Sequence, residues 1–326
     1  MFMNNKICSI ITPCFNNGNL IYRLLDSILL QDYPYIEMLI VDDGSTDTTK
    51  DVIVSYISKF NKKGYTLEYK YQKNQGQSVA INNALKWIKG EFLTWPDSDD
   101  FYNTKDAISK LIKKFSELPE DYGMIKTIPK FVSQDTLETI NTNFVNDVHE
   151  RQFEQALYNR HFPWPPGNYI IKMSAFDATN PQREIYTNKK AGQNWQMILP
   201  LLYSYKCYTL QENIFSVLVR NGSHSRTTFQ NINAKIDQAN TYEQTILKTL
   251  DRIQEMPETE RNIYKTKIIQ KYAHIKFMIS CSYQDIKMSR KYKDEIIKSN
   301  SKLSIKESLK FYLLRFPILF SLIQRL

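Results

Sequence analysis

The sequence predicts an α/β fold, a mostly parallel sheet flanked by helices, followed by a helical C-terminal extension. Apolar runs of strand length alternate with segments of helical periodicity over the first hundred residues. This alternation is typical of a parallel sheet with crossover helices. From residue 231 onward only helical periodicity remains, and the 42% apolar content allows a substantial core. We therefore expect one domain over residues 1–230 and a separate helical region over 231–326.

The expected strands are apolar runs that stop at turn residues. Four of them occupy residues 6–13, 35–41, 67–71 and 91–95. Helical spacing of apolar residues predicts the intervening helices at 20–29, 46–57 and 79–88. The second half of this domain, residues 116–230, is less regular, with strands expected at 124–132 and 169–173 and a helix at 195–205.

Polar residues follow each of the four strands, at the point where the strand ends. They lie at residues 12–14, 42–43, 74–76 and 97–100. In parallel sheets ligands bind beyond the carboxyl ends of the strands, so these groups are expected at one binding edge. Asp, Asn and Gly also favour turns, which explains each residue type singly. It does not explain why the acidic clusters follow only the second and fourth strands.

The sharpest of these groups is Asp97-Ser98-Asp99-Asp100, with three carboxylates directly after an apolar run. Like charges this close repel one another and resist burial. A bound Mg²⁺ or Mn²⁺ would relieve both costs, because these hard ions prefer carboxylate oxygens. The alternative is a solvated acidic turn that caps the next helix, and the motif alone does not separate the two.

Cysteine usage and apolar content indicate a cytoplasmic protein. The four cysteines, at 8, 14, 207 and 281, are scattered and are expected to be reduced, buried thiols. Residues 1–13 lack the features of a signal peptide. No apolar stretch approaches the roughly 20 residues that a membrane-spanning helix needs.

The positive charge is concentrated in the C-terminal region. Of the formal net charge of +9, residues 231–326 carry most, with 18 Lys and Arg against 10 Asp and Glu. Residues 308–326 combine aromatic and aliphatic side chains with basic ones, and Pro317 interrupts them. This composition favours a helix lying on an anionic membrane surface, at the inner face of the cell membrane. The alternative is a terminal helix packed on the body or on a partner subunit in an oligomer. Nucleic acid is disfavoured, since no binding motif accompanies the charge.

Taken together, the motifs resemble those of family 2 glycosyltransferases of the GT-A fold. The resemblance rests on residues 10–16, 41–47, 74–76, 80–85, 89–92 and 97–100 in their order and spacing. It is dense over residues 7–103 and loose over 160–226. Each short motif is weak alone, and their combination is specific.

The resemblance implies transfer of a sugar, with inversion, from a nucleotide-sugar donor that is usually a UDP-sugar. Mn²⁺ or Mg²⁺ would be the cofactor, and a glycan or lipid-linked glycan of bacterial surface polysaccharide assembly the acceptor. Residues 1–115 would bind the donor and residues 116–230 the acceptor. A sugar nucleotidyltransferase would need a glycine-rich basic loop after the first strand, which residues 12–17 do not provide.

By position, seven residues would serve the nucleotide, and five of them follow the first three strands. Thr12 and Pro13 would line the nucleoside pocket, and Asp43 would accept a hydrogen bond from the base. Asp42 would support that loop. Gly76 would let the backbone approach the nucleotide, as glycine does best.

The same resemblance assigns the metal. Asp99 would be the direct ligand, and Asp97 would lie near the ribose or the metal. His224 would be a metal or diphosphate ligand, and Arg226 a diphosphate contact, with the alternative that His224 is merely exposed in a loop. Asp100 would support the others or cap a helix.

The catalytic base is where the sequence departs from the family. The family places a Glu-Asp pair at a helix start, and this chain has Gln193 and Asn194 there. An amide cannot act as a general base at neutral pH. Asp177 and Glu184 are the nearest carboxylates, and each also suits an exposed loop. Three alternatives follow: another carboxylate acts, base catalysis is weak, or the chain is a non-catalytic nucleotide-sugar-binding or scaffold protein.

Overall fold

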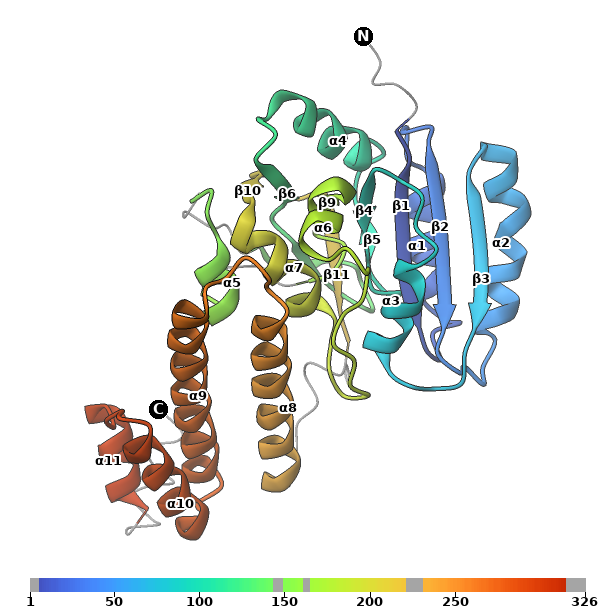
Figure 1. The fold of residues 1–326 in the computed structure, drawn as a ribbon. Coiled ribbons are helices and arrows are strands. Elements are labelled where there is room, and N and C mark those ends of the chain that lie inside the picture. Colours follow the sequence, from blue (N-terminus) through green and yellow to red (C-terminus); the bar gives the residue numbers. More distant parts are fainter. Residues whose placement is uncertain (1–5, 143–148, 161–164, 221–230, 315–326) are drawn as a thin grey trace. The chain divides into compact units, whose positions relative to one another are not determined.

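The computed structural model describes residues 6–142, 149–160, 165–220 and 231–314 (Figure 1). The chain divides into two compact units. The first contains residues 1–225 with 252–255, and the second contains residues 226–251 with 256–326. The predicted division lies close by, at residue 231.

The first unit is built on a seven-stranded sheet in the order β10-β6-β9-β4-β1-β2-β3. Its neighbouring strands are parallel except that β9 runs antiparallel to β4 and β6. The arrows of β1, β2 and β3 point the same way in Figure 1. The predicted α/β class with a mostly parallel sheet is confirmed. The strands are β1 Cys8–Cys14, β2 Ile36–Asp42, β3 Thr66–Tyr71, β4 Phe92–Thr94, β6 Tyr122–Lys126, β9 Tyr169–Lys172 and β10 Lys206–Thr209.

Strands β1 and β2 form the centre of this unit, and every one of their residues is buried. Burial on both faces explains why they read as continuous apolar runs rather than alternating ones. The crossover helices contribute their apolar faces to the same core, with Leu24 of α1 and Phe60 of α2 fully buried. The helices of this unit are α1 Ile21–Leu29, α2 Thr49–Lys63, α3 Gln77–Leu85, α4 Ala107–Glu117, α5 Phe153–Tyr158, α6 Met173–Thr179 and α7 Asn194–Ser204.

A second, four-stranded sheet has the order β5-β11-β7-β8. Its strands are β5 Phe101–Tyr102, β7 Lys130–Ser133, β8 Thr139–Thr142 and β11 Phe215–Val219. The single strand predicted over residues 124–132 is wrong, because β6 and β7 belong to different sheets. Pro129 cannot donate to a ladder, and the amides of Thr127 and Ile128 donate instead to carbonyls of Asn168 and Glu212.

The second unit is helical, as predicted. It consists of α8 Ile232–Asp251, α9 Glu258–Ser282, α10 Ile286–Lys298 and α11 Ile305–Leu313, and α8 and α9 run side by side (Figure 1). Its core includes Ile236, Phe277, Tyr292 and Ile296. Within the residues that the structure describes, no helix has both the length and the apolarity to cross a bilayer.

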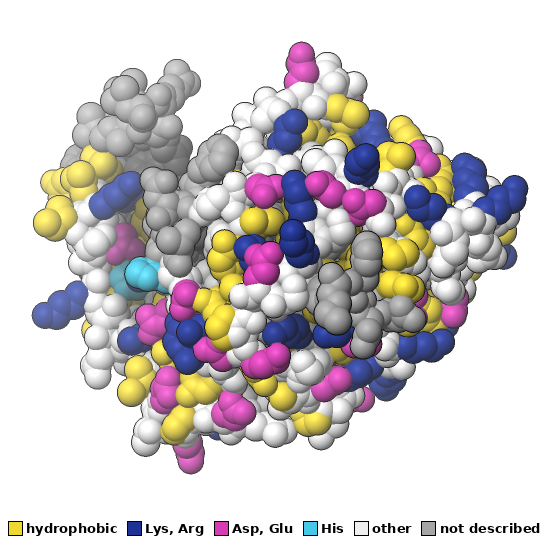
Figure 2. Space-filling view, turned by 90° about the horizontal axis from the view of Figure 1, so that it is seen from above, with side chains coloured by type: hydrophobic (Ala, Val, Ile, Leu, Met, Phe, Trp, Pro, Cys, Tyr) yellow, Lys and Arg dark blue, Asp and Glu magenta, His cyan; other side chains and the backbone are white. Residues whose placement is uncertain are grey.

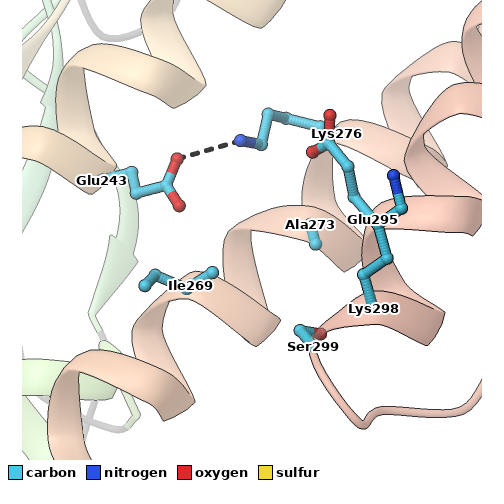
Figure 3. Close-up of a pocket in the computed structure, with 7 residues that line it drawn as sticks. All are labelled: Glu243, Ile269, Ala273, Lys276, Glu295, Lys298 and Ser299. Carbon is cyan, nitrogen blue, oxygen red and sulfur yellow. Dashed lines mark hydrogen bonds and ion pairs between the residues drawn. The ribbon is translucent and has the colours of Figure 1, made fainter. Parts of the chain in front are cut away.

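The helical unit also contains a pocket of about 320 Å³ (Figure 3). Its lining is Glu243, Ile269, Ala273, Lys276, Glu295, Lys298 and Ser299. Lys276 Nζ lies 2.9 Å from Glu243 Oε2, and both side chains are nearly buried. Every site residue predicted from the sequence that the structure describes lies in the first unit, so this pocket is a separate feature of the fold.

All four cysteines are buried and free, as the sequence predicts for structural thiols. Burial raises the pKa of the Cys14 thiol to about 12, so it stays protonated and unreactive at neutral pH. On the face that Figure 2 shows, acidic and basic side chains are interspersed with apolar ones.

Candidate functional site

The carboxyl ends of the first strands meet at one edge, and side chains join the loops that follow them. Cys14 pairs with Asp42 in the β1–β2 register. The amide of Asn17 donates to Thr49 Oγ1 over 2.9 Å, and that of Gly18 donates to Asp47 Oδ2 over 3.0 Å. The loops after β1 and β2 are therefore held to each other before any ligand binds.

Asp42 and Asp43 are both buried, and each carboxylate braces a loop. Asp42 accepts from the Ser45 amide and the Tyr69 hydroxyl, at 2.8 and 2.7 Å. Asp43 Oδ1 accepts from Gln72 Nε2 and the Gln75 amide, and its Oδ2 accepts from the Gly76 amide, each at 2.8 Å. Asp43 thus positions the loop before α3, and its contact with a base stays a prediction that would use a further lone pair of the carboxylate.

Gly76 has a φ of +97°, a conformation that strongly favours glycine. A Cβ at this position would lie 2.4 Å from the carbonyl oxygen of Lys189. The backbone that approaches Gly76 is therefore that of Lys189. The predicted approach of a nucleotide is not needed to explain the glycine.

Thr12 and Pro13 lie in β1 at the same edge. The Thr12 hydroxyl is buried and has no hydrogen-bond partner within the described part of the chain. Buried polar atoms are nearly always satisfied, so an unsatisfied hydroxyl next to this edge is an available contact for a polar ligand.

The three carboxylates of the acidic cluster have different partners. Asp97 Oδ1 accepts from Gln77 Nε2 of α3 over 2.7 Å. Asp99 Oδ2 lies 2.9 Å from Nε of Arg220, directly after β11. Asp100 Oδ1 accepts from the Leu218 amide of β11 over 2.9 Å. The predicted supporting position of Asp100 thus corresponds to a buried link between the two sheets.

The positive charge near the acidic cluster does not balance the negative charge of its three carboxylates. Burial, together with the charge of Asp99, raises the pKa of Asp97 to about 7, although Gln77, Arg220 and Gln193 oppose this shift. Burial and the same neighbouring carboxylates raise the pKa of Asp100 well above its ordinary value. A cation bound at Asp97 and Asp99 would reduce this repulsion.

Gln193 and Asn194 begin α7 beside this cluster. Gln193 is buried and lowers the pKa of Asp97, so it lies close to that carboxyl. Asn194 Oδ1 accepts from Trp95 Nε1 over 3.2 Å and from the Tyr169 hydroxyl over 2.8 Å. Trp95 and Tyr169 are fully buried and pack edge to face, with ring centroids 4.9 Å apart. The amide at the expected base position is therefore held in a fixed orientation.

The two alternative base candidates are not brought to the site. The Asp177 carboxylate is bound by both Nε and Nη2 of Arg183, at 2.7 and 2.8 Å, and Arg183 also donates to the carbonyl of Ile88 before β4. Glu184 is exposed and lies 3.5 Å from Lys86, just after α3. Both therefore lie toward the amino end of β4, whereas the acidic cluster follows its carboxyl end.

His224 and Arg226 lie outside the described residues. Trp195, adjacent to the site dipeptide, is partly buried and donates to the Ala156 carbonyl over 3.4 Å, which agrees with a packing role.

Three groups at the site were missed or given little weight by sequence reasoning. Gln77 binds Asp97. Asn17 donates to Ser98 Oγ over 2.8 Å and accepts from Arg220 over 3.4 Å. Gln77 and Asn17 could have been suspected, because each lies in or next to a loop that follows a strand. Arg220 is more than a hundred residues from Asp99, and only the pairing of β5 with β11 brings them together.

The residues present fit a divalent cation that a substrate completes. No group of three or more His, Cys, Asp or Glu side chains gathers around one point in the described segments. Mg²⁺ and Mn²⁺ commonly take one or two protein carboxylates and complete their shell with water and substrate phosphates. Asp97 and Asp99 would supply such a pair, and the metal would share the Asp99 carboxylate with Arg220 or displace it.

Comparisons with known proteins identify the family of this chain. Residues 9–177 match the model of glycosyl transferase family 2. The Staphylococcus aureus poly(ribitol-phosphate) beta-N-acetylglucosaminyltransferase TarS is 36% identical over 120 residues, which are 36% of this chain and 20% of TarS. The putative teichuronic acid biosynthesis glycosyltransferase TuaG of Bacillus subtilis is 35% identical over 111 residues, 34% of this chain and 42% of TuaG. The chain spans less than half the length of these curated relatives.

Solved structures extend the similarity to most of the chain. TarS residues 1–349 in complex with UDP-GlcNAc superpose with a TM-score of 0.56 at 16% identity, covering 90% of this chain and 89% of that one. The mannosyltransferase PcManGT of Pyrobaculum calidifontis, in complex with GDP-Man and Mn²⁺, superposes with a TM-score of 0.57 at 16% identity, covering 97% of this chain and 81% of that one. These likenesses confirm the predicted GT-A fold. Because the family model covers more than half of its residues, the chain belongs to glycosyltransferase family 2.

Proposed function

We propose that this protein is an inverting, metal-dependent glycosyltransferase. It would move a sugar from a UDP-sugar to an acceptor hydroxyl of a glycan or lipid-linked glycan in bacterial surface polysaccharide assembly. The observation that carries the proposal is the gathering of Asp97, Asp99 and the α7 dipeptide at the carboxyl end of β4 in a family 2 domain. UDP is preferred over GDP because TarS, solved with UDP-GlcNAc, is also 36% identical to this chain over 120 residues.

Each side chain at the edge has a role in this proposal. Asp97 and Asp99 would hold the metal, which stabilises the negative charge that develops on the departing diphosphate. The Thr12 hydroxyl and Pro13 would contact the nucleoside. Gln77 and Asn17 would keep the start of the acidic cluster in place, through Asp97 and Ser98. Arg220, released from Asp99, would be available to the diphosphate.

The acceptor proton is the difficult step for this chain. Asn194 presents a carbonyl oxygen that already accepts two hydrogen bonds and has negligible basicity. Asp177 is held by Arg183 away from the site. We therefore propose that Gln193 and Asn194 orient the acceptor and that base catalysis is weak in this protein.

The same amides favour a second candidate function, a nucleotide-sugar-binding or scaffold protein without transfer activity. The two candidates differ in turnover. The test is a screen of UDP-sugars with the full chain and Mn²⁺, in which the release of UDP is measured over hours.

Slow release of UDP from one sugar, lost in Asp99→Asn, supports the enzyme. Binding of UDP without release from any sugar supports the scaffold. Absence of both UDP binding and release would contradict both candidates. A control variant, Asp106→Asn, changes a partly exposed aspartate at the start of α4 and should behave as the wild type.

We also propose that the protein works at the inner face of the cell membrane, where a lipid-linked acceptor would be found. Support comes from the basic, apolar composition of residues 308–326, of which 315–326 lie outside the described part of the chain. The alternative, that this segment contacts a partner subunit in an oligomer, stays a prediction.

A further inference from the structure

The last described helix, α11, is fixed to α9 through one face. It begins with a capping box in which Ser304 and Glu307 exchange hydrogen bonds between side chain and backbone. Glu307 Oε1 lies 2.7 Å from His274 Nδ1 of α9, and His274 Nε2 lies 2.9 Å from Ser301 Oγ. Glu307 therefore faces α9 from the first turn of the helix.

The same side of α11 makes the remaining contacts. Phe311 packs on Phe277 with ring centroids 5.8 Å apart, and Lys310 Nζ donates to Ser282 Oγ over 3.1 Å. Leu313 and Leu314 are buried in the core of the helical unit. These contacts leave α11 little freedom to rotate about its axis.

The opposite side of α11 carries a row of large apolar side chains. Ile305 is 90% exposed, Leu309 56% and Tyr312 54%. Spacings of four and three residues place them on one face, which we call the outer stripe. Lys302 and Lys306 are exposed near its start. The inner contacts limit rotation of α11, so the outer stripe faces away from α9, and exposed apolar patches of this kind mark interaction sites.

We propose that the outer stripe is a docking surface for an anionic lipid bilayer. Its apolar side chains would enter the interface between headgroups and acyl chains, and the lysines would contact anionic headgroups. This inference deepens the proposed location at the membrane and rests on it. It names the described helix that makes the contact.

Charge decides between the bilayer and a second copy of the chain. A symmetric contact through the outer stripe would bring the lysines of both copies together, within a region of 18 basic against 10 acidic residues. An anionic bilayer has the opposite charge. The sequence continues directly after α11 with apolar residues and Arg315, which suits the same partner.

The test is flotation of the full chain with vesicles of phosphatidylcholine, alone or mixed with phosphatidylglycerol. We expect binding to the mixed vesicles only. The double variant Ile305→Ser, Leu309→Ser should bind at least about tenfold more weakly, because it removes several apolar carbon atoms that would be buried in the bilayer. Lys306→Glu should bind about fivefold more weakly or worse at low salt, a difference that high salt removes.

A matched control is Ile263→Ser, which alters an isoleucine of α9 that is 55% exposed. It should bind vesicles like the wild type. All the substituted side chains are exposed, and thermal unfolding followed by circular dichroism should verify that each variant is folded.

Equal flotation of the wild type and the double variant would overturn the proposal. So would a wild-type dimer in light scattering that the double variant converts to monomer, since the stripe would then contact a second copy. UDP binding is measured on the same samples. If the wild type binds UDP but does not bind vesicles, this inference alone is refuted. If the wild type does not bind UDP, the proposed function is refuted.

Discussion

Arg220 contacts one oxygen of the carboxylate that the proposed metal would use. Its Nε lies 2.9 Å from Asp99 Oδ2, and its charge opposes the rise in the pKa values of Asp97 and Asp100. A divalent cation and Arg220, both positively charged, would therefore compete for Asp99 while no nucleotide is present.

This competition predicts that removing the charge of Arg220 changes the affinities for Mn²⁺ and for UDP in opposite directions. Arg220→Met should tighten the binding of Mn²⁺ alone severalfold, and should weaken the binding of UDP with Mn²⁺ about tenfold, as expected for one lost charged contact. Both are measured by calorimetry. Arg151→Met, at an exposed arginine, is the control. Weaker binding of Mn²⁺ alone would show that Arg220 does not compete with the metal.

Asn194→Asp restores a carboxylate at the family's base position. The new side chain has nearly the same shape, and it can accept the same hydrogen bonds from Trp95 and Tyr169. We expect kcat for sugar transfer or hydrolysis to rise by roughly 10²–10⁴, the usual contribution of a general base. Steady-state kinetics measure it. Gln193→Glu is the companion variant, and an unchanged kcat in both would place the missing proton acceptor elsewhere.

Some candidate site residues were predictable from the sequence. Asp97 and Asp99 directly follow a predicted strand, whereas Gln193 and Asn194 stand where the family's motif places its base. The structure places the cluster and the dipeptide together. Asp177 could not be excluded from sequence, because its sequestration depends on Arg183, which adopts a positive φ of 49° in the following turn. Local spacing does not reveal such pairings.

The helices α8 and α9 are joined by a buried ion pair at the pocket of Figure 3. Lys276→Met would leave the Glu243 carboxylate buried without its cation, which should cost about 3–5 kcal/mol of unfolding free energy. Chemical denaturation followed by circular dichroism measures it. The control is Lys265→Met, which breaks the more exposed pair with Asp251 and should cost less than about 1 kcal/mol. Equal losses of unfolding free energy in the two variants would mean that Glu243 is accessible to water.

Because Glu307 caps α11, we expect the stability of the protein to depend on pH in the acidic range. Burial alone would raise the pKa of Glu307, but hydrogen bonds from the Ser304 amide, His274 and the Ser304 hydroxyl outweigh it and lower the pKa. A carboxyl with a lowered pKa stabilises the fold above its unfolded pKa, about 4.5. That contribution is lost as pH falls below this value.

In Glu307→Gln, the unfolding free energy should therefore fall less between pH 6 and pH 3 than in the wild type. Urea unfolding at several pH values measures it. Parallel curves for the two proteins would show that Glu307 carries no linked proton.

Among the elements, the buried strands were the most predictable. The runs predicted at 6–13 and 35–41 correspond to β1 and β2, because strands buried on both faces are apolar throughout. The small sheet was not predictable in the same way. Its β5 has only two residues, and β8 has little burial, so neither gives a periodic signal.

For the whole molecule, the fold extends further than the sequence similarity. The matches to TarS and TuaG cover about a third of the chain, and the structural likeness covers about nine tenths of it at 16% identity. The first half of the domain, residues 1–115, was predictable because its motifs follow fixed strand ends. The structure of residues 116–230 depends on packing among irregular segments, so the sequence could not identify the acceptor that this half is proposed to bind.

The central claim is that Asp99 binds a divalent cation shared with a nucleoside diphosphate. Calorimetry of UDP binding, with and without Mn²⁺, tests it on the wild type and on Asp99→Asn. Loss of this metal ligand should weaken UDP binding in the presence of Mn²⁺ by at least about tenfold. The metal-free affinity should not weaken, because the substitution releases Arg220 from Asp99. Identical UDP affinity of the two proteins in the presence of Mn²⁺ would contradict the account.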